Sequence, residues 1–285
     1  YIKEKAFYNV ENVTIDLAID SEVIIEDSAF EHCTGLRSYS FRTIKKLGKA
    51  AFKDCIGLTK FQPLPVDFIS DYSFYGCFNL KGTLSFGTST TGIGAYAFYN
   101  CSSFTGEINL PYSIASIGPF AFAKCSNCDG PLNLAASLPI INESIFAGCS
   151  KIRGTLSIPD SVVFLGNSSF AYCSGFNTLS IGYGLTEISS NSFSYCSNLT
   201  VITIPENVIS IQSSAFAYCT GIRGTLVIPD SIKTIENSAF SHCSGFTGLK
   251  IGKFLTEIND NVFEHCTRLA SLSLPEWISS IGSNS

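Results

Sequence analysis

The chain has 285 residues, enough to enclose a large core, and 45% of them are hydrophobic while only 14% are charged. No apolar run approaches the roughly 18 residues that a membrane-spanning helix needs, so we expect no membrane insertion within this sequence. The formal net charge is −5, from 18 Lys and Arg against 23 Asp and Glu, and neither sign forms a run, which argues against a nucleic-acid partner.

The element that recurs along the chain is a Phe followed three residues later by a Cys. Phe7, with Val10 in the Cys position, is the first copy, and successive Phe residues then lie 22 to 24 apart. A fixed period of this length is typical of repeat architectures. We therefore predict one domain over residues 1–285, built from about twelve repeats. The matching pairs are Phe30/Cys33, Phe52/Cys55, Phe74/Cys77, Phe98/Cys101, Phe122/Cys125, Phe146/Cys149, Phe170/Cys173, Phe193/Cys196, Phe216/Cys219, Phe240/Cys243 and Phe263/Cys266.

The elements inside one repeat follow in a constant order. After Cys149, an apolar Ile152 precedes Leu156 and Ile158, which alternate with small polar residues and predict a short half-buried strand that ends at Pro159. The segment NSSFAYC then has Asn and Ser ahead of its Phe, which predicts one capped helical turn. The apolar strand pairs are Leu84 and Phe86, Ile108 and Leu110, Leu156 and Ile158, Leu179 and Ile181, Ile202 and Ile204, Leu226 and Ile228, and Leu272 and Leu274.

One repeat offers only five or six apolar side chains, too few to close a core. Stacked repeats would supply the missing walls to each other, so we predict a solenoid in which each copy lies on the next. Its strands and helical turns would make the fold α/β. The Phe side chains would form a buried ladder and contribute roughly 1.5–3 kcal/mol each through burial.

At this level of detail the sequence resembles the BspA-like leucine-rich repeats, whose pattern reads roughly LxxLxIPxxVxxIGxxAFxxC. The copies LSIPDSVVFLGNSSFAYC and LVIPDSIKTIENSAFSHC follow it closely, and the resemblance covers residues 1–285. It implies a right-handed leucine-rich-repeat solenoid, curved like a horseshoe, with a parallel sheet on the concave face. It also implies a cell-surface or extracellular protein of mucosal bacteria or parasitic protozoa that works in adhesion.

The twelve cysteines could signal disulfides or a metal site. Eleven of them occupy one repeat position. In stacked repeats their sulfurs would project in parallel with β-carbons about 4.8 Å apart, whereas the β-carbons of a disulfide lie roughly 3.5–4.5 Å apart with converging bonds. We therefore predict a ladder of buried, reduced thiols. The pair Cys125-x-x-Cys128 looks like a redox motif, but Cys128 falls where other copies carry Leu, Ile or Phe, so we interpret it as core.

An aromatic or His side chain recurs just before the repeat Cys. The three histidines, His32, His242 and His265, belong to different copies, so they cannot share one metal ion. In five successive copies this position is predicted to form an exposed aromatic ladder, either as a structural stack or as a contact patch. Its members are Tyr172, Tyr195, Tyr218, His242 and His265.

We find no candidate catalytic residues. Catalysis needs a nucleophile and a base, or two carboxylates, held on one patch, and the acidic residues are scattered over different repeat positions. Motifs such as GxSxG and HExxH are missing from the sequence, and short strings such as Gly92-Ile93-Gly94 are typical of turns. We therefore expect no enzymatic activity, no cofactor and no metal.

The outward positions of the strands remain as a candidate binding surface, although for any single residue we favour an ordinary solvated side chain. Most are small and polar, and repeat proteins commonly bind partners through such a surface. These positions are Thr83, Ser85, Glu107, Asn109, Thr155, Ser157, Thr178, Ser180, Thr203, Thr225, Val227, Lys250, Ser271 and Ser273.

Neither end of the array shows a capping segment, which solenoids need for solubility. We expect the sequence to be a fragment of a longer chain, with self-association through its uncapped ends. The single Trp, Trp277, stands in a position that is polar in most copies. It could contact a partner or pack on a coil outside this sequence, and we favour packing on such a coil.

The leading functional hypothesis is a protein- or glycan-binding module that engages host cells or matrix. An alternative is an architectural spacer that holds another domain away from a cell surface. A third is an ice-binding solenoid, against which the interruptions Glu107, Pro131, Val227 and Lys250 argue, because ice binding needs a regular Thr and Ser array.

Overall fold

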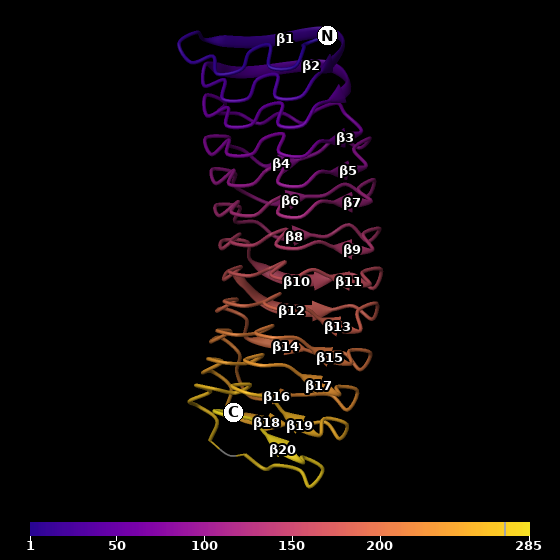
Figure 1. Cartoon of the computed structure of the whole chain (residues 1–285), viewed down its shortest axis with the longest axis vertical. Helices are drawn as coiled ribbons and strands as arrows, with labels where there is room; N and C mark the ends of the chain where they lie inside the picture. The colour runs from indigo at the N-terminus through magenta and orange to yellow at the C-terminus, as the bar shows by residue number, and fades with distance from the viewer. Residues whose placement is uncertain (271) are drawn as a thin grey trace. The chain divides into compact units, whose positions relative to one another are not determined.

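A computed structural model describes residues 1–270 and 272–285, and the chain divides into two compact units. The first unit comprises residues 1–137 and 148–150, and the second comprises residues 138–147 and 151–285. In each unit the chain coils as a parallel β-solenoid (Figure 1), as the repeat predicted. The single domain expected over residues 1–285 stays a prediction.

The first unit begins with two long parallel strands and continues with pairs of short ones. Its sheets have the orders β1-β2, β3-β5-β7 and β4-β6-β8. Leu84, Ile108 and Leu132 are partners in neighbouring strands, so equivalent residues of successive coils lie side by side. The strands are β1 (Ile15–Ile25), β2 (Leu36–Leu47), β3 (Phe68–Ile69), β4 (Leu84–Ser85), β5 (Gly92–Ile93), β6 (Ile108–Asn109), β7 (Ser116–Ile117) and β8 (Leu132–Asn133).

The second unit repeats this arrangement, with two strand positions in each coil. Strands β10, β12, β14, β16 and β18 form the first strand column, and β9, β11, β13, β15, β17, β19 and β20 form the second strand column. Their bounds are β9 (Ile140–Ile141), β10 (Gly154–Ile158), β11 (Phe164–Leu165), β12 (Phe176–Ile181), β13 (Glu187–Ile188), β14 (Val201–Thr203), β15 (Ser210–Ile211), β16 (Thr225–Val227), β17 (Thr234–Ile235), β18 (Gly248–Lys250), β19 (Glu257–Ile258) and β20 (Ser280–Ile281).

The repeat Phe side chains form the centre of each core, as predicted. In the first unit, rings from Phe7 to Phe122 stack with centroids 5.0–5.6 Å apart. In the second unit, rings from Phe146 to Phe263 stack with centroids 5.3–5.8 Å apart. Twelve Phe side chains, ten of them from these ladders, are among the largest fully buried groups. Each ring therefore completes the pocket of the next, and no coil is a stable unit by itself.

The predicted helical turns are wrong, and with them the α part of the α/β class. No helix occurs among residues 1–270 and 272–285, and the Phe-x-x-Cys segments are successive hydrogen-bonded turns. In NSSFAYC, the amides of Phe170 and Tyr172 donate to Ser192 and Ser194 of the next coil. A helix would direct these amides along its own axis, to carbonyls four residues back.

The backbone conformation of these segments explains why the predicted helical turns do not form. Ser168 and Tyr172 have φ values of 56° and 62°, in the left-handed region that a right-handed helix excludes. Asn and Ser stabilise turns as well as helix N-termini, so their presence ahead of the Phe did not distinguish the two. Contact with the next coil decides which conformation forms, because carbonyls of that coil accept hydrogen bonds from every second amide of the segment.

The last predicted strand pair is also wrong. Leu272 and Leu274 are not in a strand, and their side chains are 52% and 41% exposed. In the preceding coils the equivalent side chains are covered by the next coil, and no later coil of this sequence covers these two. Ser271, between the preceding turn and this segment, lies outside the described residues.

Candidate functional site

The polar positions predicted on the strands lie at the surface, and none of those described is buried. Ser85, Glu107 and Thr178 are partly covered. The exposed ones are Thr83, Asn109, Thr155, Ser157, Ser180, Thr203, Thr225, Val227, Lys250 and Ser273. Alternation along each strand produces this result, because the neighbouring apolar residues point into the core. Whether these residues contact a partner stays a prediction.

Strand register brings some of these residues together within the second unit. Thr155 pairs with Thr178, and Ser157 pairs with Ser180, which pairs with Thr203. An open hollow of about 360 Å³ lies where β10, β12 and β14 end. Its lining residues are Ser157, Ile158, Pro159, Asp160, Ser180, Ile181, Gly182, Tyr183, Thr203 and Pro205. Strand alternation predicted the hydroxyls but not Asp160 and Tyr183, which directly follow the strand ends.

The five predicted ladder residues form a stack in the second unit. Ring centroids are 4.5 Å apart for Tyr172 and Tyr195, 4.3 Å for Tyr195 and Tyr218, 4.2 Å for Tyr218 and His242, and 4.4 Å for His242 and His265. The rings from Tyr172 to His242 are nearly parallel, so the faces between them are covered, whereas the His265 ring is tilted by 47° against His242. This geometry favours a structural stack over a contact patch, because a partner could stack only on the outer rings.

A second aromatic cluster, in the first unit, was missed by the sequence analysis. Tyr72 stacks on Tyr96, Tyr75 stacks on Tyr99, and both pairs have centroids 5.0 Å apart. The Lys124 ammonium lies 5.1 Å from the centre of the Tyr99 ring, and its hydrogen bond to the Tyr99 hydroxyl raises the pKa of Lys124. Equivalent Tyr residues 24 apart were the signal that could have revealed this cluster.

The thiol ladder has a hydrogen bond at each step. Each thiol from Cys55 to Cys266 in the Phe-x-x-Cys position donates to the carbonyl oxygen of the Phe one coil back, with Sγ to O distances of 2.9–3.3 Å. All twelve cysteines are free, and only Cys266 is not fully buried. Burial raises the pKa of Cys196 to about 12, so this thiol stays protonated and unreactive at neutral pH.

Cys128 behaves as the core interpretation of the Cys125-x-x-Cys128 motif predicted. Its side chain is completely buried, and burial raises the pKa of Cys128 to about 12. A redox-active cysteine needs a lowered pKa and solvent access. Cys128 has neither.

Thiol titration with an aromatic disulfide reagent at pH 8 should distinguish a reduced ladder from a cross-linked one. In the folded protein we expect no more than one fast-reacting thiol, Cys266, because the others are buried and protonated. In denaturant without reductant we expect all twelve to react. Fewer than ten reacting thiols under denaturing conditions would contradict the ladder.

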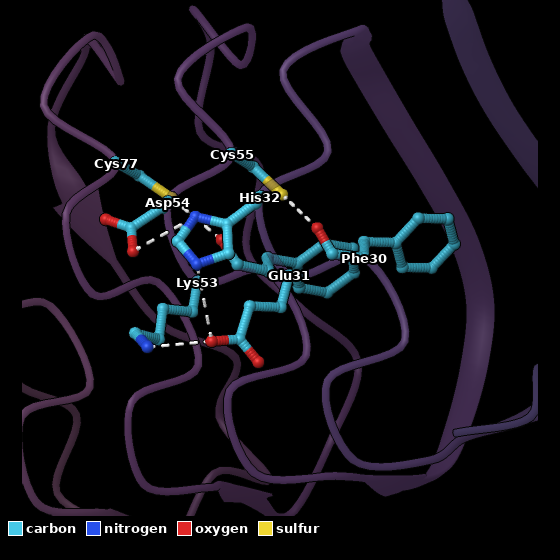
Figure 2. A network of polar contacts seen from close by, with 8 residues as sticks. Phe30, Glu31, His32, Lys53, Asp54, Cys55 and Cys77 are labelled. Atoms are coloured by element: carbon cyan, nitrogen blue, oxygen red, sulfur yellow. Dashed lines mark hydrogen bonds and ion pairs between the residues drawn. The ribbon is translucent and has the colours of Figure 1, made fainter. Parts of the chain in front are cut away.

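His32 is the centre of an ionic cluster in the first unit (Figure 2). Its Nε2 lies 3.7 Å from Glu31 Oε1, and its Nδ1 lies 3.6 Å from Asp54 Oδ2. Lys53 Nζ is 2.7 Å from the same Glu31 oxygen. Burial alone would raise the pKa of Glu31, but hydrogen bonds from Lys53 and Ser28 hold it below its ordinary value. The cluster connects two coils and brings no nucleophile to the imidazole, since Cys55 Sγ donates to Phe30 O.

Two further kinds of feature, metal sites and membrane-spanning helices, bear on function in the described residues. No group of three or more His, Cys, Asp or Glu among residues 1–270 and 272–285 could hold a metal ion. No helix in this part of the chain is long and apolar enough to cross a membrane.

The end of the second unit has an apolar hollow of about 220 Å³ lined by Phe263, Leu272 and Leu274 among others. Trp277 donates its indole N–H to the Gly252 carbonyl of the preceding coil at 3.1 Å, and its side chain is 42% exposed. Its packing on a coil outside this sequence stays a prediction.

Comparison with known sequences agrees with this geometry. The profile of the BspA type leucine rich repeat region matches residues 1–81, 61–177, 128–247 and 223–285, which together span the chain. Among curated proteins, no sequence matches.

Several solved structures are similar to the chain. A leucine rich cell surface protein from Faecalibacterium prausnitzii is 20% identical with a TM-score of 0.53, over 99% of this chain and 76% of that one. A leucine-rich repeat protein from Bacteroides ovatus is 22% identical with a TM-score of 0.47, over 91% of this chain and 90% of that one. A leucine rich repeat protein from T. pallidum is 25% identical with a TM-score of 0.48, over 57% and 75%. The Faecalibacterium structure shows that the fold is shared.

Proposed function

Because the chain belongs to the BspA-type leucine-rich repeat family, we propose that it is a non-catalytic binding module of a surface or secreted protein. Its partner would be a protein or glycan of a host cell or matrix, and its role would be adhesion. The observation that carries this proposal is the exposed row of small polar side chains on β10, β12 and β14, fixed in register by the sheet.

The positions and partners of the reactive side chains favour a binding role over a catalytic one. The thiols are intrinsically strong nucleophiles, but all except Cys266 are buried, and thiols such as Cys219 donate to backbone carbonyls. The ionic cluster at His32 is spread over surface side chains that pair with one another. What remains free to interact is the surface, and repeat proteins commonly bind through such extended surfaces.

Membership of the same family supports the proposed surface location. The similar protein from Faecalibacterium prausnitzii is a cell surface protein. The absence of charge along Ser157, Ser180 and Thr203 favours recognition by hydrogen bonds over long-range attraction, because each hydroxyl can both donate and accept. Sheet pairing holds these groups in place before a partner arrives, which lowers the entropy lost on binding.

Replacing Thr203 with arginine tests the proposal. Thr203 is exposed on β14, and a long charged side chain there would block the hydroxyl row. We expect the wild-type chain to bind members of a panel of immobilised matrix proteins and cell-surface glycans, and T203R to bind at least about tenfold more weakly, which corresponds to about 1.4 kcal/mol. Surface plasmon resonance would measure both.

The matched control is Thr234→Arg, which introduces the same charge at an exposed Thr on β17 in the second strand column. We expect T234R to bind as the wild type does. Equal losses in T203R and T234R would show that the first strand column is not the binding surface. No binding by the wild-type chain would contradict the binding role and favour the architectural spacer.

A further inference from the structure

The hollow at the ends of β10, β12 and β14 combines three kinds of group within the second unit. Ser157, Ser180 and Thr203 supply a row of hydroxyls, Asp160 supplies a carboxylate, and Tyr183 supplies an aromatic ring. Among the described residues, none of the three hydroxyls has a protein partner. Neighbouring strands are about 4.8 Å apart, so the row offers hydrogen bonds at regular steps.

Tyr183 is fixed in position although its ring is free. The side chain is 73% exposed. Its backbone N–H donates to Asp160 Oδ1 at 2.8 Å, and its carbonyl accepts from Asn207 Nδ2 at 3.0 Å. Asn207 Nδ2 also donates to the Leu185 carbonyl, so the turn is held by the coil before it and the coil after it. Because the backbone of the turn is already fixed, only the side-chain torsions of Tyr183 have to be ordered when a ligand covers the ring.

The charge of the lining limits the class of ligand. Asp160 is the only ionisable side chain of the hollow besides the Tyr183 phenol, and no Lys or Arg lines it. An anionic ligand would meet a carboxylate without a compensating cation. A neutral ligand with many O–H donors would find an acceptor in Asp160 and donors and acceptors in Ser157 and Ser180.

The middle strand of the hollow cannot accept a peptide added as a strand. Strand β12 has a hydrogen-bonded neighbour on each side in the order β10-β12-β14, so it offers no open edge to an extended peptide. A pyranose fits the lining better. Its ring edge carries hydroxyls that match the Ser and Thr row, and its C–H face can cover an exposed aromatic ring.

We propose that this hollow is a subsite for a neutral saccharide, a hexose or an N-acetylhexosamine within an oligosaccharide. The Tyr183 ring covers the C–H face of one sugar, Asp160 accepts hydrogen bonds from its hydroxyls, and Ser157, Ser180 and Thr203 bind along the chain of sugars. This inference rests on the proposed function and specifies its ligand class.

The test uses an array of neutral, sialylated and sulfated oligosaccharides, followed by calorimetric titration with the strongest neutral binder. We expect the wild-type chain to bind neutral sugars and Tyr183→Ala to weaken the binding at least about tenfold. In saturation-transfer NMR, the sugar C–H protons should receive magnetisation from the wild-type protein, and this transfer should fall in Y183A. Thermal unfolding of Y183A should match the wild type, because the lost ring is exposed.

Tyr112→Ala is the matched control. Tyr112 occupies the equivalent position after Leu110-Pro111 in the first unit and is 78% exposed. The strand beside it carries Asn109, paired with Asn133, in place of the hydroxyl row. We expect Y112A to bind the sugar as the wild type does.

Three results would overturn the saccharide subsite: no neutral sugar binds, sulfated or sialylated sugars bind better, or Y183A binds the sugar as tightly as the wild type. These results are distinguishable from failure of the proposed function. A protein partner that T203R loses and Y183A retains, in the absence of sugar binding, would leave a binding module but remove its saccharide site.

Discussion

Replacing Phe170 with alanine should lower the free energy of unfolding by about 3–5 kcal/mol, the range of large-to-small changes in well-packed cores. Phe170 is completely buried between Phe146 and Phe193, whose ring centroids lie 5.5 and 5.8 Å away. Truncation would remove the contacts on both faces and leave a cavity that rigid coils on either side cannot fill. Urea denaturation followed by circular dichroism would measure the loss.

Phe164→Ala provides the matched control in the same unit. Phe164 lies on β11 and is 53% exposed, so its truncation creates no cavity. We expect it to cost less than about 1 kcal/mol, as surface substitutions usually do. A loss below about 1 kcal/mol for Phe170→Ala would mean that the phenyl ladder is not the core. Equal losses in the two variants would lead to the same conclusion.

Alkaline pH should unfold the protein between about pH 9 and 12. Burial raises the pKa of Cys196 from 9.0 to about 12, and it raises the pKa of Cys55, Cys101 and Cys219 well above the ordinary value. Below pH 9 these thiols are protonated in both the folded and the unfolded chain, so their contribution to stability is fully present. As the pH rises towards the folded pKa, the unfolded chain loses protons that the folded chain retains, and stability falls.

The size of the effect follows from the number of thiols. At pH 10, one unit above the ordinary pKa, each thiol that ionises only on unfolding lowers the free energy of unfolding by about 1.4 kcal/mol. Eight such thiols together lose on the order of 11 kcal/mol, comparable to the whole stability of a typical domain. The eight, each at most 1% exposed, are Cys55, Cys77, Cys101, Cys125, Cys149, Cys196, Cys219 and Cys243.

Circular dichroism and thiolate absorbance, recorded together during a pH titration in reductant, should report one transition. Cys196→Ala separates thiol ionisation from the titration of surface Lys and Tyr. Between pH 9 and 12 the free energy of unfolding should fall less steeply in this variant than in the wild type. The difference in slope should be about 1.4 kcal/mol per pH unit, because one thiol has been removed. An unchanged slope in Cys196→Ala would show that the buried thiols do not drive the transition. Thiolate absorbance that rises before the loss of folded signal would also contradict this explanation.

The sequence alone determined the repeat and the inward residues of most coils. The Phe and Cys residues recur every 22 to 24 residues, and the apolar strand pairs alternate with polar residues. Both patterns can be seen in the sequence of single coils, and stacking does not change which of these residues point inward. For this reason the phenyl ladder, the buried thiols and the outward hydroxyls could be predicted from residue positions. Leu272 and Leu274 have the same pattern but are exposed, because burial needs a following coil.

The candidate site was only partly predictable for the same reason. The hydroxyls of Ser157 and Ser180 follow from strand alternation, which is a local property. The position of Tyr183 depends on two hydrogen bonds. Its N–H donates to Asp160, one coil before it, and its carbonyl accepts from Asn207, one coil after it. Nothing in the segment Gly182-Tyr183-Gly184 by itself distinguishes a turn that both neighbouring coils hold in place from an ordinary turn.

Tertiary structure alone decided the conformation of the NSSFAYC segments. Their Asn and Ser residues are compatible with a helix cap and with a turn. The choice is made by carbonyls of the next coil, which accept the amides of Phe170 and Tyr172 and hold Tyr172 at a positive φ. Side-chain periodicity is a property of a single coil, but hydrogen bonding in this solenoid belongs to pairs of coils, and local sequence therefore specified the first and not the second.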